Sequence, residues 1–211
     1  GFAIPSEMVA SVIAAAKGGG VSESGAIVRP WLGVTAQSVT SDIADSLDLS
    51  RPAGALISKL HPASPLKEAG LESGDLVIKV GGGDIRDPAE MKFRMATVPI
   101  GETTTVTAVR DGREKTYTVK AIAPPEEPPR NTIELTGEHA FNGARVANLN
   151  PAVAVELGLG AHIDNTKPLV VVTHVEPGTP AARFIRPGDI LIEINDAAIE
   201  KPSDVPRALE T

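Results

Sequence analysis

The chain has 211 residues, with 20 Lys and Arg against 27 Asp and Glu, a formal net charge of -7 and no cysteine. These numbers exclude a disulfide framework, a thiolate metal site and a cysteine nucleophile, and an acidic chain without a basic run is a poor candidate for nucleic-acid binding. The longest apolar stretch, residues 9–16, is too short to span a bilayer, which takes about 20 apolar residues.

The first predicted element is a helix that begins after Ser6, a good N-cap residue, and ends at Gly18. Residues 18–26 are rich in glycine and serine, a composition typical of a flexible tether. Both segments precede the first region in which strands are expected.

A series of short elements follows, and its order predicts an α+β fold that is mainly β. The expected elements are a strand at 32–39, a short helix at 42–47, a strand at 55–60, a helical turn at 64–69, a strand at 75–80 and a helix at 88–98. The last helix has a strong start signal in Asp87, Pro88 and Glu90. Two β-rich runs around Asp111-Gly112 then predict a hairpin.

An internal repeat shows that this fold occurs twice. Residues 56–65 (LISKLHPASP) match residues 171–180 (VVTHVEPGTP) at an offset of 115, and residues 69–80 match residues 184–194 after one deletion, which makes the offset 114. A period this long indicates two copies of a whole domain, because solenoid units run about 20 to 50 residues.

Domain boundaries follow from the repeat. We expect domains at 27–123 and 132–211, joined by residues 124–131, a proline-rich segment typical of a polyproline II spacer. The second copy ends at the counterpart of Thr97. It therefore lacks the hairpin, because the chain is truncated or because those strands come from another chain.

The sequence contains no recognisable catalytic constellation. None of the four histidines has metal-ligand spacing, neither a G-x-S-x-G elbow nor a G-[DN]-S-G-G loop occurs, and the glycine triplets lack the Lys-Ser/Thr of a phosphate loop. We therefore predict no catalytic residue, no metal and no cofactor.

A candidate peptide site lies at the start of the first copy, in the sequence RPWLGV of residues 29–34. Consecutive backbone N–H groups in such a loop can hold a carboxylate, and an extended peptide can add to the free edge of the strand that follows. The predicted site residues are Arg29, Trp31, Leu32, Gly33, Val34, Thr35, Ala36, Met91, Arg94 and Met95. The alternatives are that the two methionines are core, that Arg29 is an ordinary surface cation and that Trp31 only shields the loop.

These residues carry a family resemblance. W-L-G-V, followed by G-A-L-I-S-K-L-x-P-x-S-P, A-G-L-x-x-G-D-L-V-I-K-V, a D-P-A-E helix and a V-x-R-D-G hairpin, resembles a PDZ domain of the bacterial, circularly permuted kind. The second copy resembles another. Residues 1–17 resemble the last strand and linker helix of the trypsin-like domain in HtrA/Deg (Do-type) serine endopeptidases.

The resemblance implies a fold, a site and a parent protein. The family's carboxylate-binding loop falls on Arg29 to Gly33 and its peptide-accepting strand on Val34 to Gln37, while its catalytic triad lies upstream. The parent would be a periplasmic quality-control protease, homo-oligomeric through its protease domain. This region would then bind unfolded or C-terminal peptide segments of substrates without cleaving them. The alternative is a non-enzymatic tandem-PDZ scaffold or secretion component.

The second copy departs from the pattern at its loop. Phe141, Asn142, Gly143 and Ala144 stand where the first copy has Trp31, Leu32, Gly33 and Val34. Polar Asn142 and small Ala144 predict a shallower, more polar pocket, so we expect this copy to bind an apolar terminus only weakly.

Overall fold

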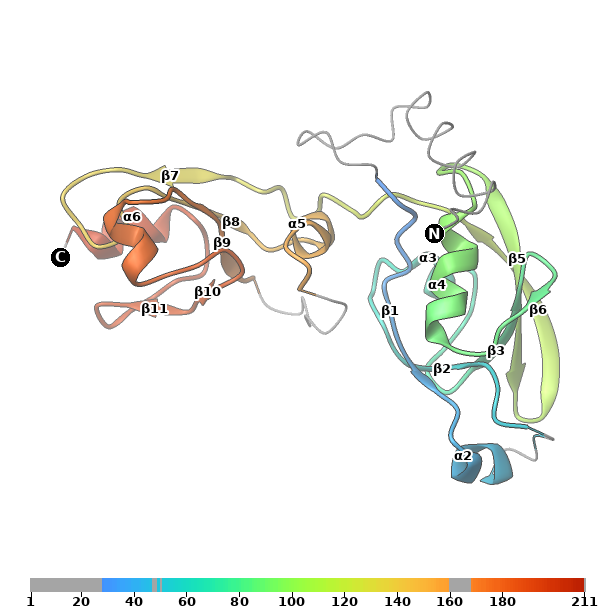
Figure 1. Ribbon diagram of the computed structural model, residues 1–211. Helices are drawn as coiled ribbons and strands as arrows, with labels where there is room; N and C mark the ends of the chain where they lie inside the picture. Colours follow the sequence, from blue (N-terminus) through green and yellow to red (C-terminus); the bar gives the residue numbers. More distant parts are fainter. Residues whose placement is uncertain (1–27, 47–48, 50, 160–167, 211) are drawn as a thin grey trace, which may run out of the picture. The chain divides into compact units, whose positions relative to one another are not determined.

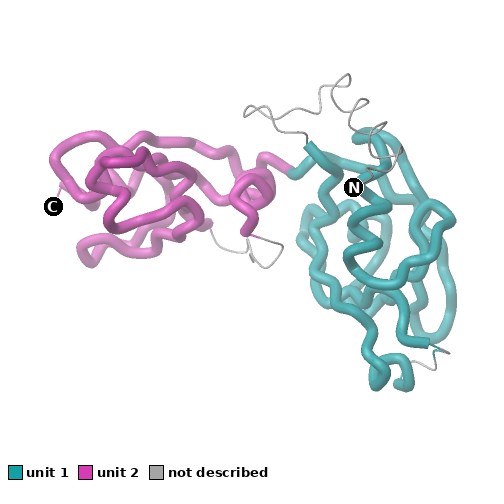
Figure 2. The backbone as a smooth tube through the Cα atoms, viewed as in Figure 1, with its two compact units in different colours: residues 1–124 teal, residues 125–211 magenta. Residues whose placement is uncertain are grey.

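The computed structural model describes residues 28–46, 49, 51–159 and 168–210. The chain forms two compact units, residues 1–124 and residues 125–211 (Figure 2). The helix and tether expected before residue 27 lie outside the described residues. Within the described ranges, no helix is long and apolar enough to cross a membrane, and no three His, Asp or Glu side chains cluster as metal ligands would.

Unit 1 is built on one antiparallel sheet with the strand order β1-β2-β3-β5-β6, and a two-residue strand, β4, pairs with β3 (Figure 1). The strands are β1 (Val34–Ser38), β2 (Ala55–Leu60), β3 (Leu76–Val80), β4 (Gly83–Asp84), β5 (Thr103–Arg110) and β6 (Arg113–Lys120). The expected hairpin is present, and its turn places Asp111 and Gly112 at φ 50° and 70°, the left-handed conformation that the sequence predicts. β4 was not predicted, since two residues carry no periodic signal.

Three helices accompany this sheet: α2 (Ser41–Ser46), α3 (Pro65–Glu68) and α4 (Pro88–Ala96). α4 begins where its capping signal predicts, and Asp87 Oδ1 accepts the Glu90 N–H at 2.8 Å. α4 packs across β1, β2 and β3 (Figure 1). Its buried residues, Met91 and Met95, lie in one core cluster with apolar side chains of β1, β2, β3, β5 and β6.

Unit 2 has a smaller sheet with the order β10-β9-β8-β7 and a separate β11-β12 pair. The strands are β7 (Ile133–Leu135), β8 (Ala144–Asn148), β9 (Val170–Val175), β10 (Ile190–Leu191), β11 (Glu193–Ile194) and β12 (Ala197–Ala198). Its helices are α5 (Pro151–Glu156), the 3-10 helix η1 (Pro180–Arg183) and α6 (Asp204–Leu209). By the sequence repeat, α6 is the counterpart of α4 at an offset of 114, and β8 is the counterpart of β1 at an offset of 110.

Backbone hydrogen bonds repeat between the units at the offsets seen in the sequence. In unit 1, Ile57 N–H donates to Asp75 O at 2.9 Å, and in unit 2 Val172 N–H donates to Asp189 O at the same distance. Three further hydrogen bonds of unit 1 have a counterpart in unit 2. Gly74 N–H donates to Ile57 O, as Gly188 N–H does to Val172 O, and Ile85 N–H donates to Ile78 O, as Ile199 N–H does to Ile192 O. Glu72 N–H donates to Asp75 Oδ2, as Arg186 N–H does to Asp189 Oδ2. The sequence repeat is therefore a repeat of the fold.

The proline-rich segment expected as a spacer is hydrogen-bonded to unit 2. Arg130 forms ion pairs with Glu126 at 2.6 Å and with Glu156 of α5 at 2.7 Å. Asn148 N–H, at the end of β8, donates to Arg130 O at 2.7 Å. The hydrogen bond from Arg130, more than any other interaction, holds the pKa of Glu126 below its ordinary value.

Candidate peptide-binding site

The loop that precedes β1 is shaped around a glycine. Gly33 has φ +57°, and a Cβ atom placed on it would lie 2.5 Å from Cη2 of Trp31. The Trp31 ring in turn meets the His61 ring edge to face, with centroids 5.1 Å apart. A side chain at Gly33 would therefore strain the backbone and displace Trp31 whether or not a peptide binds there, so substituting this glycine is not a clean test of the site.

The carbonyl groups of this loop are fixed from the protein side. Ser64 Oγ donates to Leu32 O at 2.6 Å, and His61 N–H donates to Gly33 O at 2.8 Å. The Trp31 N–H donates to Ile122 O at 2.8 Å, which ties the start of the loop to the residues after β6. The loop is thus held in one conformation before any ligand arrives.

Two amide groups of the same loop, those of Leu32 and Gly33, have no acceptor among the described residues. Leu32 and Gly33 are buried, yet within the described part of the chain no atom accepts a hydrogen bond from either N–H. Buried backbone N–H groups almost always have a partner, so these two consecutive groups are candidates to receive an acceptor that the described residues do not supply. A carboxylate is the acceptor that such a concavity suits best.

β1 continues from this loop and lies at the edge of its sheet. Among the described strands, β1 pairs only with β2, with a register shift between Thr35 and Ala36. α4 packs against β1, as Figure 1 shows. The structure therefore brings together the loop, an unpaired strand edge and a helix, the parts that the sequence placed at the site.

The predicted side chains divide into two groups. Leu32, Val34, Met91 and Met95 lie in one buried core cluster, and both methionines are only 1% exposed. The methionines thus occupy the core, the position that the alternative reading gave them. Arg29 is exposed.

Arg94 belongs to a network of charges on α4. It donates to Glu90 at 3.1 Å and lies against Gly83, where a side chain would collide with its guanidinium. Arg86 also pairs with Glu90, at 2.9 Å, and its hydrogen bond is the main cause that lowers the pKa of Glu90. Arg94 is thus already engaged with its own helix and with β4.

The corresponding loop of unit 2 has no unused amide at these positions. Asn142 N–H donates to His139 O at 3.2 Å, Gly143 N–H to Leu135 O at 2.9 Å, and Ala144 N–H to Phe141 O at 3.2 Å. β8 is not an edge strand either, because it lies between β9 and β7. Sequence reasoning missed β7, which has no described counterpart in unit 1.

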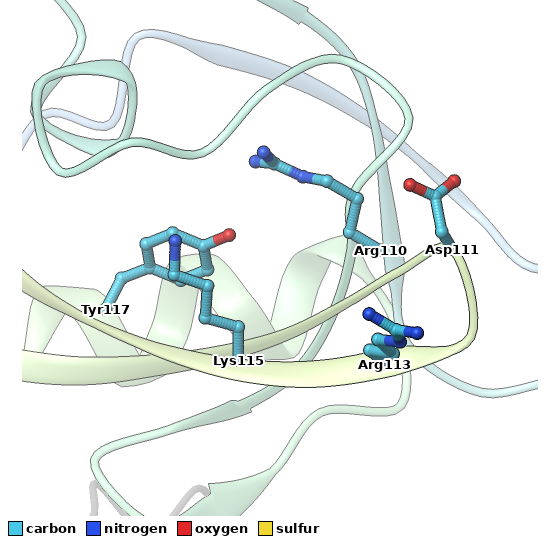
Figure 3. A pocket seen from close by; sticks show the side chains of 5 residues that line it. All are labelled: Arg110, Asp111, Arg113, Lys115 and Tyr117. Carbon is cyan, nitrogen blue, oxygen red and sulfur yellow. The ribbon is translucent and has the colours of Figure 1, made fainter.

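A shallow hollow of about 370 Å³ lies elsewhere on unit 1, at the β5–β6 hairpin (Figure 3). Arg110, Asp111, Arg113, Lys115 and Tyr117 line it. Arg110 is bound to Asp75 through two hydrogen bonds of 2.6 and 2.7 Å, and Lys115 lies over the Tyr117 ring. β6 is at the opposite end of the strand order from β1, so this hollow is separate from the candidate site.

Comparison with known proteins matches residues 30–121 to one family of PDZ domain and residues 171–211 to another. The chain is 33% identical over 97% of its length to a probable periplasmic serine endoprotease, DegP-like, from Bartonella henselae, and 31% identical over 94% to one from a Marinomonas species. It spans 38% and 39% of the length of these two relatives. A solved structure of the HtrA-type protease AlgW with a decapeptide aligns with 61% of this chain and 38% of that one, at 26% identity and a TM-score of 0.45.

Proposed function

The chain belongs to the PDZ domain family, with one domain in each unit, and from this premise we propose that unit 1 binds the free C-terminus of extended peptides. The terminal carboxylate accepts hydrogen bonds from the N–H groups of Leu32 and Gly33. The preceding peptide residues add to the edge of β1 as a further antiparallel strand.

The two unused N–H groups carry this proposal. A hydrogen bond to a charged acceptor contributes about 1.5 to 3 kcal/mol, and more than one can form here without any rearrangement, because Ser64 and His61 already hold the loop. Arg29, exposed four residues before Gly33, adds a positive charge near the carboxylate.

The side chain of the last peptide residue packs against Leu32 and Val34, of which 8% and 4% stay exposed, and Met91 and Met95 lie in the same core cluster. Methionine is adaptable enough to accommodate different apolar side chains above it. We therefore expect a preference for an apolar terminal residue without strict selection of one type.

We propose a regulatory role for the pair of domains in a larger protein. The names of the relatives, and the share of their length that the chain spans, support a parent that is a periplasmic serine endopeptidase of the HtrA type whose protease domain lies outside this sequence. That the parent is homo-oligomeric stays a prediction from the family resemblance. This region would then tether substrate C-termini for that domain and would not cleave them. The sequence that precedes residue 1 in the parent tests this assignment. A G-N-S-G-G-type loop there would support a protease, and a parent without one would be a scaffold.

Peptide binding is tested with the 211-residue protein and two peptides that differ only at the terminus, one a free acid and one an amide. We expect the amide to bind about ten- to a hundredfold more weakly, since it cannot supply the charged acceptor. Amide NMR spectra locate the site: the free acid should shift Leu32 and Gly33 and leave Asn142 and Gly143 unchanged, so the second domain is the control within the same sample.

Two substitutions refine this test. Arg29→Ala should weaken binding of the free acid about threefold, as expected for an exposed charge. Arg113→Ala, exposed on the strand farthest from β1 in the sheet order, should have no effect. Equal affinity for acid and amide, or shifts confined to residues outside the loop and β1, would disprove the proposed site.

A further inference from the structure

β7 occupies in unit 2 the place that the proposed peptide would take in unit 1. β8 is the counterpart of β1, and Gly143 is the counterpart of Gly33, at an offset of 110 in this part of the repeat. The carbonyls of both glycines are held alike, because His61 N–H donates to Gly33 O and Glu176 N–H donates to Gly143 O. On the edge of β8 away from β9, however, the chain's own residues 133–135 form an antiparallel strand.

The direction of β7 is the one that a C-terminal peptide would have. Its register pairs Leu135 with Ala144 and Ile133 with Val146, so its carboxyl end lies at the loop and its amino end farther along the strand. Gly143 N–H donates to the carbonyl oxygen of Leu135 at 2.9 Å. That carbonyl takes the hydrogen bond that, by analogy with unit 1, a terminal carboxylate would receive.

The side chains of β7 alternate as those of an added strand should. Leu135 is 1% exposed and lies in the core cluster that contains Val205 and Ala208 of α6, the helix at the offset of α4. Ile133 is partly buried against the same cluster. Glu134 between them is exposed and lies 3.8 Å from Arg145 on β8. The segment thus presents two apolar residues inward, two positions apart.

We propose that Ile133–Leu135 is an internal ligand of the second domain, and that its release opens a second site for peptides with apolar residues at the last and third-last positions. This proposal rests on the proposed function in one respect: it assumes that a peptide binds by adding as a strand with its C-terminus at the loop. It also adds a second physical reason, besides the polarity of Asn142, to expect weak peptide binding by the second domain: the edge of β8 and the Gly143 N–H are already occupied.

A tethered ligand competes strongly with a free one. Only residues 136–143 separate β7 from β8, and a connection this short gives an effective concentration in the millimolar range. A free peptide of equal intrinsic affinity would therefore need a millimolar concentration to displace β7. Weakening β7 without changing β8 should lower that requirement in proportion.

The first experiment titrates the 211-residue protein with the free-acid peptide Asn-Thr-Ile-Glu-Leu, the sequence of residues 131–135, and follows the amides of residues 144–148 by NMR. Ile133→Ala should strengthen binding at these amides about tenfold relative to the unaltered chain, because it removes apolar contact from the internal ligand alone. Glu134→Ala, on the exposed side of β7, should leave binding unchanged and is the matched control.

The second experiment locks β7 in place. The chain has no cysteine, so Glu134→Cys with Arg145→Cys creates a unique pair at facing register positions. The oxidised form should show no shift of residues 146–148 with the peptide at any concentration, and reduction should restore the shift. The response of Leu32 and Gly33 in unit 1 should be the same in both forms, which separates failure of this proposal from failure of the proposed function.

Hydrogen exchange of the unaltered chain distinguishes a ligand from a structural strand. An internal ligand should open locally, so the amides of residues 133–135 should exchange at least tenfold faster than those of β9 and independently of low urea. If they exchange only with the unfolding of the whole unit, β7 is a structural strand and the proposal is wrong. The same conclusion follows if folded Ile133→Ala binds the peptide no better than the control.

Discussion

The two units share one backbone scaffold and differ at one strand edge. Matching hydrogen bonds fix the same turns, with Gly74 and Gly188 donating to equivalent strand carbonyls. The edge of β1 pairs with no described strand, whereas the edge of β8 is covered by β7. Among the described residues, the two equivalent strand edges therefore differ by the presence of β7 in unit 2.

A second difference lies at the repeated Gly-Asp turn. Asp75 is fully buried and holds a bidentate ion pair with Arg110 of the hairpin. Asp189 is exposed, and from the described residues its side chain accepts only the Arg186 N–H. The Asp75 carboxylate, with its hydrogen bonds, raises the pKa of Arg110, so the arginine stays charged at every accessible pH. Unit 1 therefore depends on its hairpin through a charge pair that the described part of unit 2 lacks.

The largest effect is expected from a substitution that removes the Asp75–Arg110 ion pair of unit 1. Asp75→Asn should destabilise unit 1 by about 2 kcal/mol, as expected when a buried carboxylate loses its charged hydrogen bonds to a partly exposed arginine, and Asp189→Asn should cost unit 2 less than about 0.5 kcal/mol. Urea unfolding followed by the fluorescence of Trp31, the one tryptophan in the chain, reports on unit 1, and amide NMR intensities report on unit 2. Similar losses in both units would contradict this account.

A smaller effect on stability is expected at Ser64, in the turn after β2, and at its counterpart Thr179, in the turn after β9. Ser64 is fully buried, caps α3 through Leu66 N–H and donates to Leu32 O. Its counterpart Thr179 donates to Glu176 O and caps nothing with its side chain.

Ser64→Ala should therefore cost unit 1 about 1.5 kcal/mol and speed exchange of the Leu32 and Gly33 amides, whereas Thr179→Ala should cost unit 2 about 0.5 kcal/mol. The urea midpoints of both units measure the difference. A larger loss for Thr179→Ala would show that the two turns are held by different means than their hydrogen bonds indicate.

The sequence predicted the fold of unit 1 well, because its strong signals are local. Asp87 caps α4 and Asp111-Gly112 makes the hairpin turn, and both are read directly from residue type. The repeat then transferred this fold to unit 2. β7 escaped prediction because three residues, Ile-Glu-Leu, carry too little periodicity and the alignment supplied no partner for them.

The sequence indicated where the candidate site lies and that backbone N–H groups there can hold a carboxylate, and both stay predictions. The sequence RPWLGV indicated the loop. Residue types do not show, however, that the N–H groups of Leu32 and Gly33 have no acceptor among the described residues; that observation comes from the structure. Residue type also did not decide whether Met91 and Met95 line a groove or fill the core, since both uses have the same spacing. Their burial decides for the core.

The smallest effect on stability is expected from the ion pairs that hold the segment before β7 in unit 2. Glu126, Arg130 and Glu156 fix the segment that leads into β7, and Asn148 at the end of β8 binds the backbone of Arg130. Because the folded state lowers the pKa of Glu126 below 4.5, this stabilisation is fully present above pH 4.5 and is lost as the pH falls through the lowered value. Arg130, whose pKa is raised, does not titrate.

We therefore expect unit 2 to lose about 0.5 kcal/mol of stability through this carboxylate on acidification, a size typical of exposed ion pairs. Glu126→Gln should remove that part of the pH dependence, and Glu127→Gln, the adjacent exposed carboxylate, should leave it unchanged. Urea midpoints of unit 2 at neutral and acidic pH measure it, with unit 1 as the reference. An unchanged pH dependence in Glu126→Gln would mean that the ion pairs do not hold this segment, and that β7 is retained by Leu135 and its strand pairing alone.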